Sequence, residues 1–329
     1  MKHILIANPA AGHVNSVPML FEEANRLSAK YDVEIHKTTG KGNATAFVRD
    51  YIAAHPNERV RFYACGGDGT LNEVVNATAY APECVSISVY PCGSGNDFVK
   101  YYGGKEAFLS LEALFEGEER EIDLITDGKE YSVNVANFGF DYSVCKTMEK
   151  MRRRPLFGGK RAYFAGVAAS LFTAMKNRAR VVADGMLLNE KETFLLCTVA
   201  CGTYVGSSYM CAPRSCNEDG LLEICLVTPV SLPKFLSLMG PYSRGEHLDD
   251  KRFQRVVRYV RAKSITVTSP EKGFGYALDG EMHPSDSFTL TVAPRALRFA
   301  IPQAAVEIAE KRVANHGILK EEKQPAVLN

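Results

Sequence analysis

The stretch Cys65-Gly66-Gly67-Asp68-Gly69-Thr70-Leu71-Asn72-Glu73 decides the fold, and it follows the apolar run Val60–Ala64. Apolar residues then continue at helical spacing from Val74 to Ala77. This order predicts a strand, a tight turn and the N-terminus of a helix. Backbone N–H groups at such a turn carry partial positive charge, and glycines let a ligand approach them closely. We therefore expect a bound phosphate here, with a metal ion or a transferred proton near Asp68.

Strand and helix patterns alternate around this stretch, from Lys2 to Tyr90. Alternation of this kind predicts a parallel sheet with helices on both faces, and ligands of such sheets bind beyond the carboxyl ends of the strands. The predicted strands are Lys2–Ala7, Val33–Lys37, Arg59–Cys65 and Val85–Tyr90, and the predicted helices are Val17–Lys30, Ala44–His55 and Leu71–Tyr80.

Strand patterns dominate after Glu121, where short apolar runs are separated by Gly, Asp and Pro. They predict an antiparallel sandwich or barrel, so the chain is α/β plus all-β. Helical patterns interrupt the strands at Ala162–Lys176 and Pro233–Met239, and the tail after Ala304 begins as a helix. The predicted strands are Glu121–Thr126, Glu130–Phe138, Arg180–Leu188, Glu192–Cys201, Leu221–Val227, Ser264–Thr268, Phe288–Ala293 and Leu297–Ile301.

Composition limits the class of protein. A chain of 329 residues with 46% hydrophobic residues suits two domains with packed cores. Lys plus Arg number 39 and Asp plus Glu number 38, a balance that speaks against nucleic-acid binding. The apolar start of the chain is too short for a signal peptide, and no window is apolar enough for a membrane span. The nine cysteines lack zinc-ligand spacing, so we expect reduced thiols, many of them in the core.

Three further segments contain residues that suit a nucleotide site. Asn8–Gly12 and Pro91–Phe98 each follow a predicted strand, and Asp279–Glu281 lies far downstream. Each segment alone is typical of an ordinary turn, since Gly, Pro, Asn and Asp are the usual turn residues. The patterns GxxxxGK[ST] and GxGxxG are both absent, so the phosphate loop is neither a P-loop nor a dinucleotide fingerprint.

Taken in order, these segments resemble the catalytic-domain family of diacylglycerol kinases, in its branch of soluble bacterial lipid kinases. Sphingosine and ceramide kinases are related to this branch. The resemblance covers nearly the whole chain. NAD kinases share the pattern Gly66–Thr70, whereas its extension to Val74 followed by Pro91–Phe98 is specific to lipid kinases. Supporting matches lie at Gly42–Ala44, Asp123, Asn137–Asp141, Asn217–Leu222 and Asp279–Glu281.

The resemblance implies an N-terminal doubly wound α/β nucleotide-binding domain like that of NAD kinase and a C-terminal antiparallel β-sandwich domain. The active site would lie in the cleft between them. Residues 1–125 would form the first domain, with residues from about 296 to 329 returning to it, and residues 126–295 the second. The resemblance also implies ATP and Mg²⁺ as cofactors and phosphoryl transfer to a lipid hydroxyl, most simply from diacylglycerol to phosphatidic acid.

The same resemblance assigns the catalytic and nucleotide-binding residues. Glu281 would accept the proton of the acceptor hydroxyl, and Asp68 would act with it, near the phosphates and the catalytic Mg²⁺. His283 is a second candidate base, but a lone histidine beside a proline is more often a residue of the rim. The residues implied to hold ATP are Asn8, Thr38, Gly66, Gly67, Asp68, Gly69, Thr70, Leu71, Asn72, Glu73 and Ser94.

The family also has a structural Mg²⁺ site. Asp219, with the backbone carbonyl groups of Cys216 and Leu221, resembles that site. Asp97 and Asp123 resemble acids that extend the carboxylate network.

This chain departs from the family pattern at two positions. Asn43 stands where the family often has Asp, and Ser94 stands where it often has Thr. Both substitutions keep a polar side chain, so they affect details of nucleotide contact rather than the reaction.

Two other classes of function stay open at this point. An NAD-kinase-like enzyme would share Gly66–Thr70, and a nucleotide-binding regulator would have kept the fold and lost turnover. The acids Asp68, Asp219 and Glu281 favour a working enzyme over a regulator.

The sequence leaves the identity of the lipid and the oligomeric state open, and a homodimer fits as well as a monomer. We expect a cytoplasmic protein that works peripherally at the inner membrane face. The basic run Arg152–Arg161 and the apolar stretch behind it form either a membrane-contacting element or a surface helix.

Overall fold

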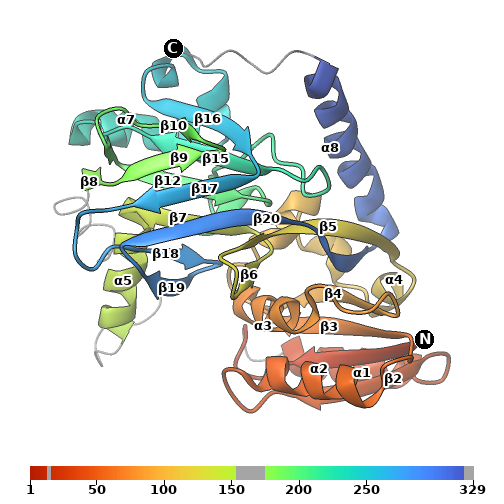
Figure 1. Cartoon of the computed structure of the whole chain (residues 1–329). Helices are drawn as coiled ribbons and strands as arrows, with labels where there is room; N and C mark the ends of the chain where they lie inside the picture. Colours follow the sequence, from red (N-terminus) through yellow and green to blue (C-terminus); the bar gives the residue numbers. More distant parts are fainter. Residues whose placement is uncertain (13–15, 153–174, 322–329) are drawn as a thin grey trace.

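The computed structural model of the chain describes residues 1–12, 16–152 and 175–321 (Figure 1). In its N-terminal half, four strands pair in parallel in the order β2-β1-β3-β4. Strands β3 and β4 are buried along their whole length, as parallel strands covered on both faces should be. The elements are β1 (Lys2–Ala7), α1 (Ser16–Leu27), β2 (Asp32–Lys37), α2 (Asn43–Ala54), β3 (Val60–Gly66), α3 (Asp68–Thr78), β4 (Val85–Pro91), the 3₁₀ helices η1 (Phe98–Tyr102) and η2 (Glu106–Phe108), and α4 (Leu111–Phe115).

The C-terminal half contains a six-stranded antiparallel sheet in the order β16-β15-β12-β7-β18-β19. Its elements are β5 (Glu118–Thr126), β6 (Tyr131–Ser132), β7 (Val135–Gly139), α5 (Phe140–Arg152), β8 (Asn177–Arg178), β9 (Arg180–Ala183), β10 (Met186–Leu187), β11 (Thr193–Phe194), β12 (Leu196–Ala200), β13 (Tyr204–Val205), β14 (Tyr209–Met210), β15 (Leu222–Val227), α7 (Leu232–Ser243), the 3₁₀ helices η3 (Glu246–Leu248) and η4 (Lys251–Phe253), β16 (Val257–Ala262), β17 (Ser264–Thr268), β18 (Gly275–Leu278), β19 (Glu281–Pro284), β20 (Ser287–Ile301) and α8 (Gln303–Glu321).

This six-stranded sheet packs against a second layer that contains β9, β17 and the start of β20. Phe138 and Ile224 of the first layer belong to the same buried cluster as Val181, Ile265 and Leu290 of the second. Two antiparallel layers around one apolar interior form a β-sandwich. The α/β half and the β-sandwich predicted from the sequence are therefore both present.

The sheets of the two halves are not separate, although the sequence predicted two domains. A single ten-stranded sheet, which includes β10-β9-β17-β20-β4-β3-β1-β2, extends through both halves. Strand β20 makes this continuity, because it pairs with β17 through residues 287–291, with β4 at Phe299 and with β5 along residues 291–301. The sequence predicted two strands here, and the structure has one strand of 15 residues. Its register shifts between Ala293 and Leu297, where Pro294 cannot donate a hydrogen bond and Arg295 has a φ of 50°.

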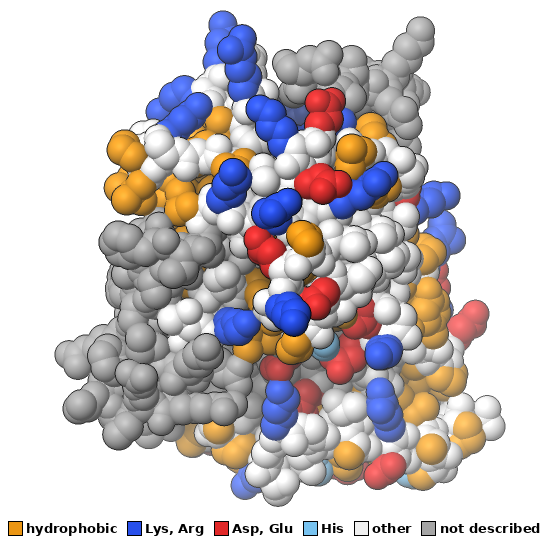
Figure 2. All heavy atoms as spheres, turned by 60° about the vertical axis from the view of Figure 1, so that its left-hand side comes forward, with side chains coloured by type: hydrophobic (Ala, Val, Ile, Leu, Met, Phe, Trp, Pro, Cys, Tyr) orange, Lys and Arg blue, Asp and Glu red, His pale blue; other side chains and the backbone are white. Residues whose placement is uncertain are grey.

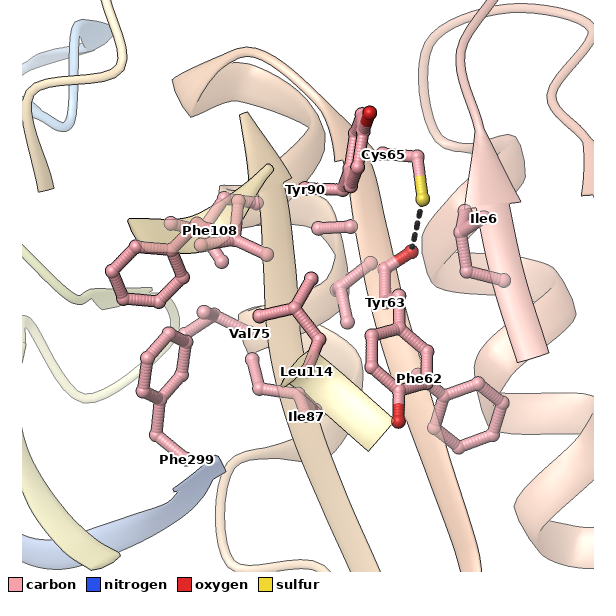
Figure 3. Close-up of a cluster of buried hydrophobic side chains, with 14 of the residues drawn as sticks. Ile6, Phe62, Tyr63, Cys65, Val75, Ile87, Tyr90, Phe108, Leu114 and Phe299 are labelled. Carbon is pink, nitrogen blue, oxygen red and sulfur yellow. Dashed lines mark hydrogen bonds between the residues drawn. The ribbon is translucent and has the colours of Figure 1, made fainter. Parts of the chain in front are cut away.

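The end of the chain contributes to the core of the N-terminal half. Phe299 of β20 lies among Val75, Ile87 and Phe108 (Figure 3). Ala305 and Ala309 of α8 are fully buried in the same cluster. The chain therefore returns to the α/β half after the sandwich, while the domain boundaries given above stay a prediction.

Other expectations differ in detail. Helix α5 begins directly after Gly139, whose φ of 84° ends strand β7, and this helix was not predicted from the sequence. The helix expected over Ala162–Lys176 and the basic run to Arg161 lie almost entirely outside the described residues. Over the described ranges, every helix falls short of the length and apolar character that crossing a bilayer needs.

Asp279 joins the β18–β19 hairpin to the chain before β7. Its carboxylate accepts hydrogen bonds from the backbone N–H groups of Val133, Asn134 and Val135 and from the hydroxyl of Ser132. Asp279 and Gly280 form the two-residue turn of the hairpin, both with positive φ, since Leu278 pairs with Glu281. This carboxylate therefore fixes where the hairpin lies beside the N-terminal half.

Asp279→Ala should destabilise the protein by about 3–5 kcal/mol, because three backbone N–H groups lose their acceptor in a buried place. Urea unfolding measures the effect. Asp286→Ala removes an exposed carboxylate from the neighbouring turn and should change stability by less than about 0.5 kcal/mol. Equal losses in the two variants would contradict the anchoring role of Asp279.

Candidate active site

Two glycine turns meet at the carboxyl ends of β3 and β4. The N–H groups of Cys92 and Gly93 both donate to the carbonyl oxygen of Gly66. A Cβ on Gly93 would fall inside the backbone of Gly67, and a Cβ on Gly66 would collide with the side chain of Thr70. Only glycine therefore allows these loops to approach so closely.

The first of these turns leads directly into α3. Gly67 is the extended N-cap residue, and Asp68 is the first residue of the helix. The N–H groups of Thr70 and Leu71 bond back to Gly67, while Gly69 faces open space. The first N–H groups of a helix lack intrahelical partners and attract anions. This helix N-terminus is therefore suited to hold phosphate oxygens.

Asn8 and Thr38 lie beside this turn, at the ends of β1 and β2. Asn8 donates through its side-chain amide to the hydroxyl of Thr70 at 2.9 Å. Thr38 donates its N–H group to the carbonyl oxygen of Ala7. The structure thus gathers the polar residues that follow the parallel strands at one edge of the sheet.

Asp68 and Asp97 form an acidic pair between the two turns. Asp68 Oδ1 accepts the N–H group of Asp97 at 2.8 Å, and Asp97 Oδ2 accepts the N–H group of Ser207 at 3.0 Å. Lys100 donates to the other oxygen of Asp97. Burial, with the negative charges of Asp97 and Asp279, raises the pKa of Asp68 to about 6. Shifts of this kind are common at functional sites.

A cavity of about 980 Å³ begins at this acidic pair and continues into the sandwich half. Asp68, Ser94, Asp97, Asp279 and Gly280 line one part of it. The remaining wall is mainly apolar and includes Phe140, Leu196, Val227, Phe235, Leu238 and Phe253. The site therefore combines an acidic, glycine-rich end with a large apolar chamber.

Three residues of the predicted nucleotide set make contacts within the protein. Leu71 is buried in the core and lines the cavity. Asn72 donates to the backbone of Tyr131. Glu73 accepts the N–H groups of Gly42 and Ala44 and so caps α2. These contacts fix α3 between its neighbours.

Glu281 lies at the rim beside the cavity. It directly follows Gly280, which lines the cavity, and its carboxylate forms an ion pair with the ammonium group of Lys41. This hydrogen bond raises the pKa of Lys41. Lys41 belongs to the loop after β2, so the pair connects the α/β half with the sandwich. His283 stacks on Tyr276 with the ring centroids 5.1 Å apart.

Asp68 is the carboxylate that would hold a cation at this turn. Asp68 Oδ2 lies 2.8 Å from the position that a Cβ on Gly95 would take, so a side chain at residue 95 would press on this oxygen. Mg²⁺ in kinases is commonly held by one or two carboxylates together with phosphate oxygens and water. The carboxylate of Asp68 at a phosphate-binding turn fits that donor set, and the Mg²⁺ site itself stays a prediction.

The loop around Asp219 has a different environment. Asp219 forms an ion pair with Arg261 of β16 and also accepts the N–H group of Leu221. Arg261 contacts Glu223 as well, directly across the β15–β16 ladder. Within residues 1–12, 16–152 and 175–321, no three His, Cys, Asp or Glu side chains gather as a metal cluster. Arg261 thus supplies positive charge at the place where the resemblance implies a structural Mg²⁺. The metal site at Asp219 stays a prediction.

Asp123 and the neighbouring Glu218 are also bound by the protein itself. The carboxylate of Asp123 accepts the N–H groups of Gly220 and Arg295, and burial raises its pKa. Glu218 makes a bidentate contact with Arg120 of β5. Asp123 therefore holds the loop and the bulge of β20 together, away from the acidic pair.

Sequence reasoning did not find Lys41, Lys100, Ser207 and Arg261. Lys41 and Arg261 meet their acidic partners across long sequence separations. Ser207 meets Asp97 through its backbone N–H group, and Lys100 pairs with Asp97 three residues before it. The pattern Asn137–Asp141 was the one available signal for the cavity wall, since Asn137 and Asp141 both line it.

Asp68→Asn should stabilise the protein without ligands above pH 6. The pKa of Asp68 is about 6 when folded, against an ordinary value of 3.8, so the folded state keeps a proton that the unfolded state has lost. Wild-type stability therefore falls between about pH 4 and pH 6, and the asparagine variant should gain about 1–3 kcal/mol above that range. Urea unfolding over a pH series measures this, with Asp286→Asn as the control. A gain that persists below pH 4 would contradict this explanation.

Arg261→Met should lower the unfolding free energy by about 3–5 kcal/mol, because Asp219 and Glu223 lose a buried partner. Thermal unfolding of the variant and of the wild type, each in EDTA, measures this loss. Arg255→Met, at an exposed position six residues earlier, is the control. A strong loss of stability in EDTA would show instead that a metal ion holds this loop.

Comparisons with known proteins agree with this geometry. Residues 2–126 match the family of the diacylglycerol kinase catalytic domain, and residues 134–301 match the YegS C-terminal NAD kinase beta sandwich-like domain. The diacylglycerol kinase of Bacillus subtilis (strain 168) is 28% identical over 84% of this chain and 88% of its own length. A protein of Pseudomonas fluorescens named probable lipid kinase YegS-like is 27% identical over 84% and 88%.

A solved structure has the same fold. The crystal structure of a diacylglycerol kinase from Bacillus anthracis str. Sterne superposes with a TM-score of 0.66 at 18% identity, covering 92% of this chain and 98% of that one. Two consecutive domain matches and relatives over most of the chain identify the family. The chain belongs to the family of diacylglycerol kinases and YegS-like lipid kinases.

Proposed function

We propose that this protein is an ATP- and Mg²⁺-dependent lipid kinase, and that its acceptor is most simply diacylglycerol, which becomes phosphatidic acid. The cavity carries this proposal, because it joins the acidic pair at the phosphate-binding turn to a large apolar chamber. Another lipid alcohol, such as a sphingoid base or phosphatidylglycerol, would likewise place its hydroxyl group at the acidic pair and its apolar chains in the chamber. The names of the relatives favour diacylglycerol.

The residues of the chain have distinct tasks in this reaction. The N–H groups at the start of α3 hold phosphate oxygens, and Asp68 lies where the transferred group would be. Bound Mg²⁺ would neutralise charge on the phosphates. Glu281 accepts the proton of the lipid hydroxyl once its carboxylate leaves Lys41. Lys41 is then free to approach the phosphates.

The apolar chamber decides between the candidate substrates. Acyl chains bury their surface against side chains such as Phe140 and Phe235, whose rings lie 5.4 Å apart. A dinucleotide acceptor would need polar partners along its whole length. The chamber therefore favours a lipid over NAD. Because such a lipid resides in a bilayer, we also propose that the protein works peripherally at the cytoplasmic membrane face.

Glu281→Gln should lower kcat by about 10²–10⁴-fold, because the amide cannot accept the proton of the acceptor hydroxyl. The KM for ATP should change little, since the phosphate-binding turn is untouched. Glu130→Gln, an exposed carboxylate in a neighbouring loop, is the control. A loss of less than about tenfold would assign Glu281 to positioning instead.

Labelled ATP and Mg²⁺, offered with a panel of lipids and with NAD, test the function itself. Labelled diacylglycerol would support the proposal, and Asp68→Ala should remove that label. Labelled NADP would reveal an NAD-kinase-like enzyme, and nucleotide binding without transfer would reveal a regulator. Either of these two results would overturn the proposal.

A further inference from the structure

Two polar side chains in the wall of the cavity have no task in the reaction described above. Asn137 of β7 and Asp141 of α5 both line the cavity. Phe140 and Val144 line it from the same helix and belong to one apolar cluster, so Asp141 lies on the apolar face of α5. An amide and a carboxyl group therefore interrupt a wall that otherwise suits hydrocarbon chains.

Strand β7 leads from the acidic end of the cavity towards the chamber. Val135 donates its N–H group to Asp279, which lines the cavity together with Asp68. Asn137 comes two residues later, about 7 Å further along the strand, and Asp141 follows just after the strand ends. A lipid with its hydroxyl at the acidic pair and its chains in the chamber would place the link between them along this stretch.

The side chain of Asn137 is buried without a partner. The residue is only 4% exposed, and its Oδ1 atom lacks a hydrogen-bond partner within the described part of the chain. Buried amide groups are nearly always paired, because an unpaired one is costly. Since Asn137 lines the cavity, a ligand there can supply what the protein does not.

The carboxyl group of Asp141 has no counter-charge in the cavity. Burial alone raises its pKa to about 6. Among the described residues that line the cavity there is no Lys, Arg or His, and Figure 2 shows Lys and Arg side chains at the outer surface of the face that it draws. Acyl chains that displace water from the chamber would make the charged form still less favourable. The neutral carboxyl group then has one O–H donor to offer.

We propose that Asn137 and Asp141 form a linkage site, which donates hydrogen bonds to the ester carbonyl groups of an acyl lipid. The donors are the side-chain N–H groups of Asn137 and the O–H group of Asp141, and carbonyl oxygens are acceptors only. This inference rests on the proposed function and deepens it, because it assigns the residues that distinguish diacylglycerol from lipid alcohols without acyl carbonyl groups.

Titration calorimetry without ATP tests the linkage site with two short-chain lipids. One is the dihexanoyl ester of glycerol, and the other is the dihexyl ether, which has the same free hydroxyl but no carbonyl group. The wild type should bind the ester about tenfold or more tightly than the ether. Asp141→Leu and Asn137→Leu should each reduce this preference, and both changes together should abolish it.

The controls separate the donated hydrogen bond from charge and from folding. Asp141→Asn keeps an N–H donor of similar size, so it should keep the ester preference. Ser143→Ala lies on α5 outside the cavity lining and should bind both lipids like the wild type. Asp141→Leu should unfold at the same temperature as the wild type or higher, because it removes a buried carboxyl group without a counter-charge.

The outcomes also separate the linkage site from the proposed function. Equal affinity of the wild type for ester and ether, or an ester preference that survives in the double leucine variant, would overturn the linkage site. Loss of the preference in Asp141→Asn would overturn it too, since a charged carboxylate would then be the group that acts. Ester binding with the expected losses but no phosphate transfer to any lipid would support the linkage site and overturn the kinase function instead.

Discussion

The close approach of two backbones, at Gly67 and Gly93, is the constraint on which the site depends. A side chain at Gly93 would force the loops after β3 and β4 apart, since its Cβ would lie 2.3 Å from the Cα atom of Gly67. Asp97 follows the second loop, so its N–H group could then no longer reach Asp68. This one steric condition allows the approach of Asp97 to Asp68 at the start of α3. The raised pKa of Asp68 and the acidic end of the cavity follow from that approach. Glycine is needed here because no other residue leaves enough space.

The site also requires that the C-terminal part of the chain returns to the α/β half. Strand β20 crosses from the sandwich to the α/β half and contributes Phe299 to the core there. Asp279 holds the preceding hairpin against the chain before β7, which brings Gly280 to the cavity and Glu281 to its rim. The active site therefore depends on residues that are about 200 positions apart in the chain and are brought together by backbone pairing and buried hydrogen bonds.

The sequence predicted the α/β half well for a physical reason. Parallel strands buried on both faces are continuous apolar runs, and glycines mark the turns where a ligand approaches. It predicted several sandwich strands, such as β15 and β17, but missed the β18–β19 hairpin. It could not give the pairing, because the register between distant strands leaves no local signal. Pro294 broke the pattern of β20, although the strand continues through a bulge. The resemblance pointed to Asp68, Asp97 and Glu281, whereas Lys41 and Arg261 act through long-range ion pairs that no spacing reveals.

The long pairing of β20 with β5 has a mechanical consequence. Many kinases bring their domains together around a hinge when substrates bind. Here both strands run through the junction and pair along residues 291–301, so a hinge between the two halves is confined to the bulge between Ala293 and Leu297. This pairing limits how far the two halves can move apart. Side chains and short loops would then make most of the adjustment to substrates. A frame held in this way favours reacting groups that are aligned before binding over a large movement of the two halves.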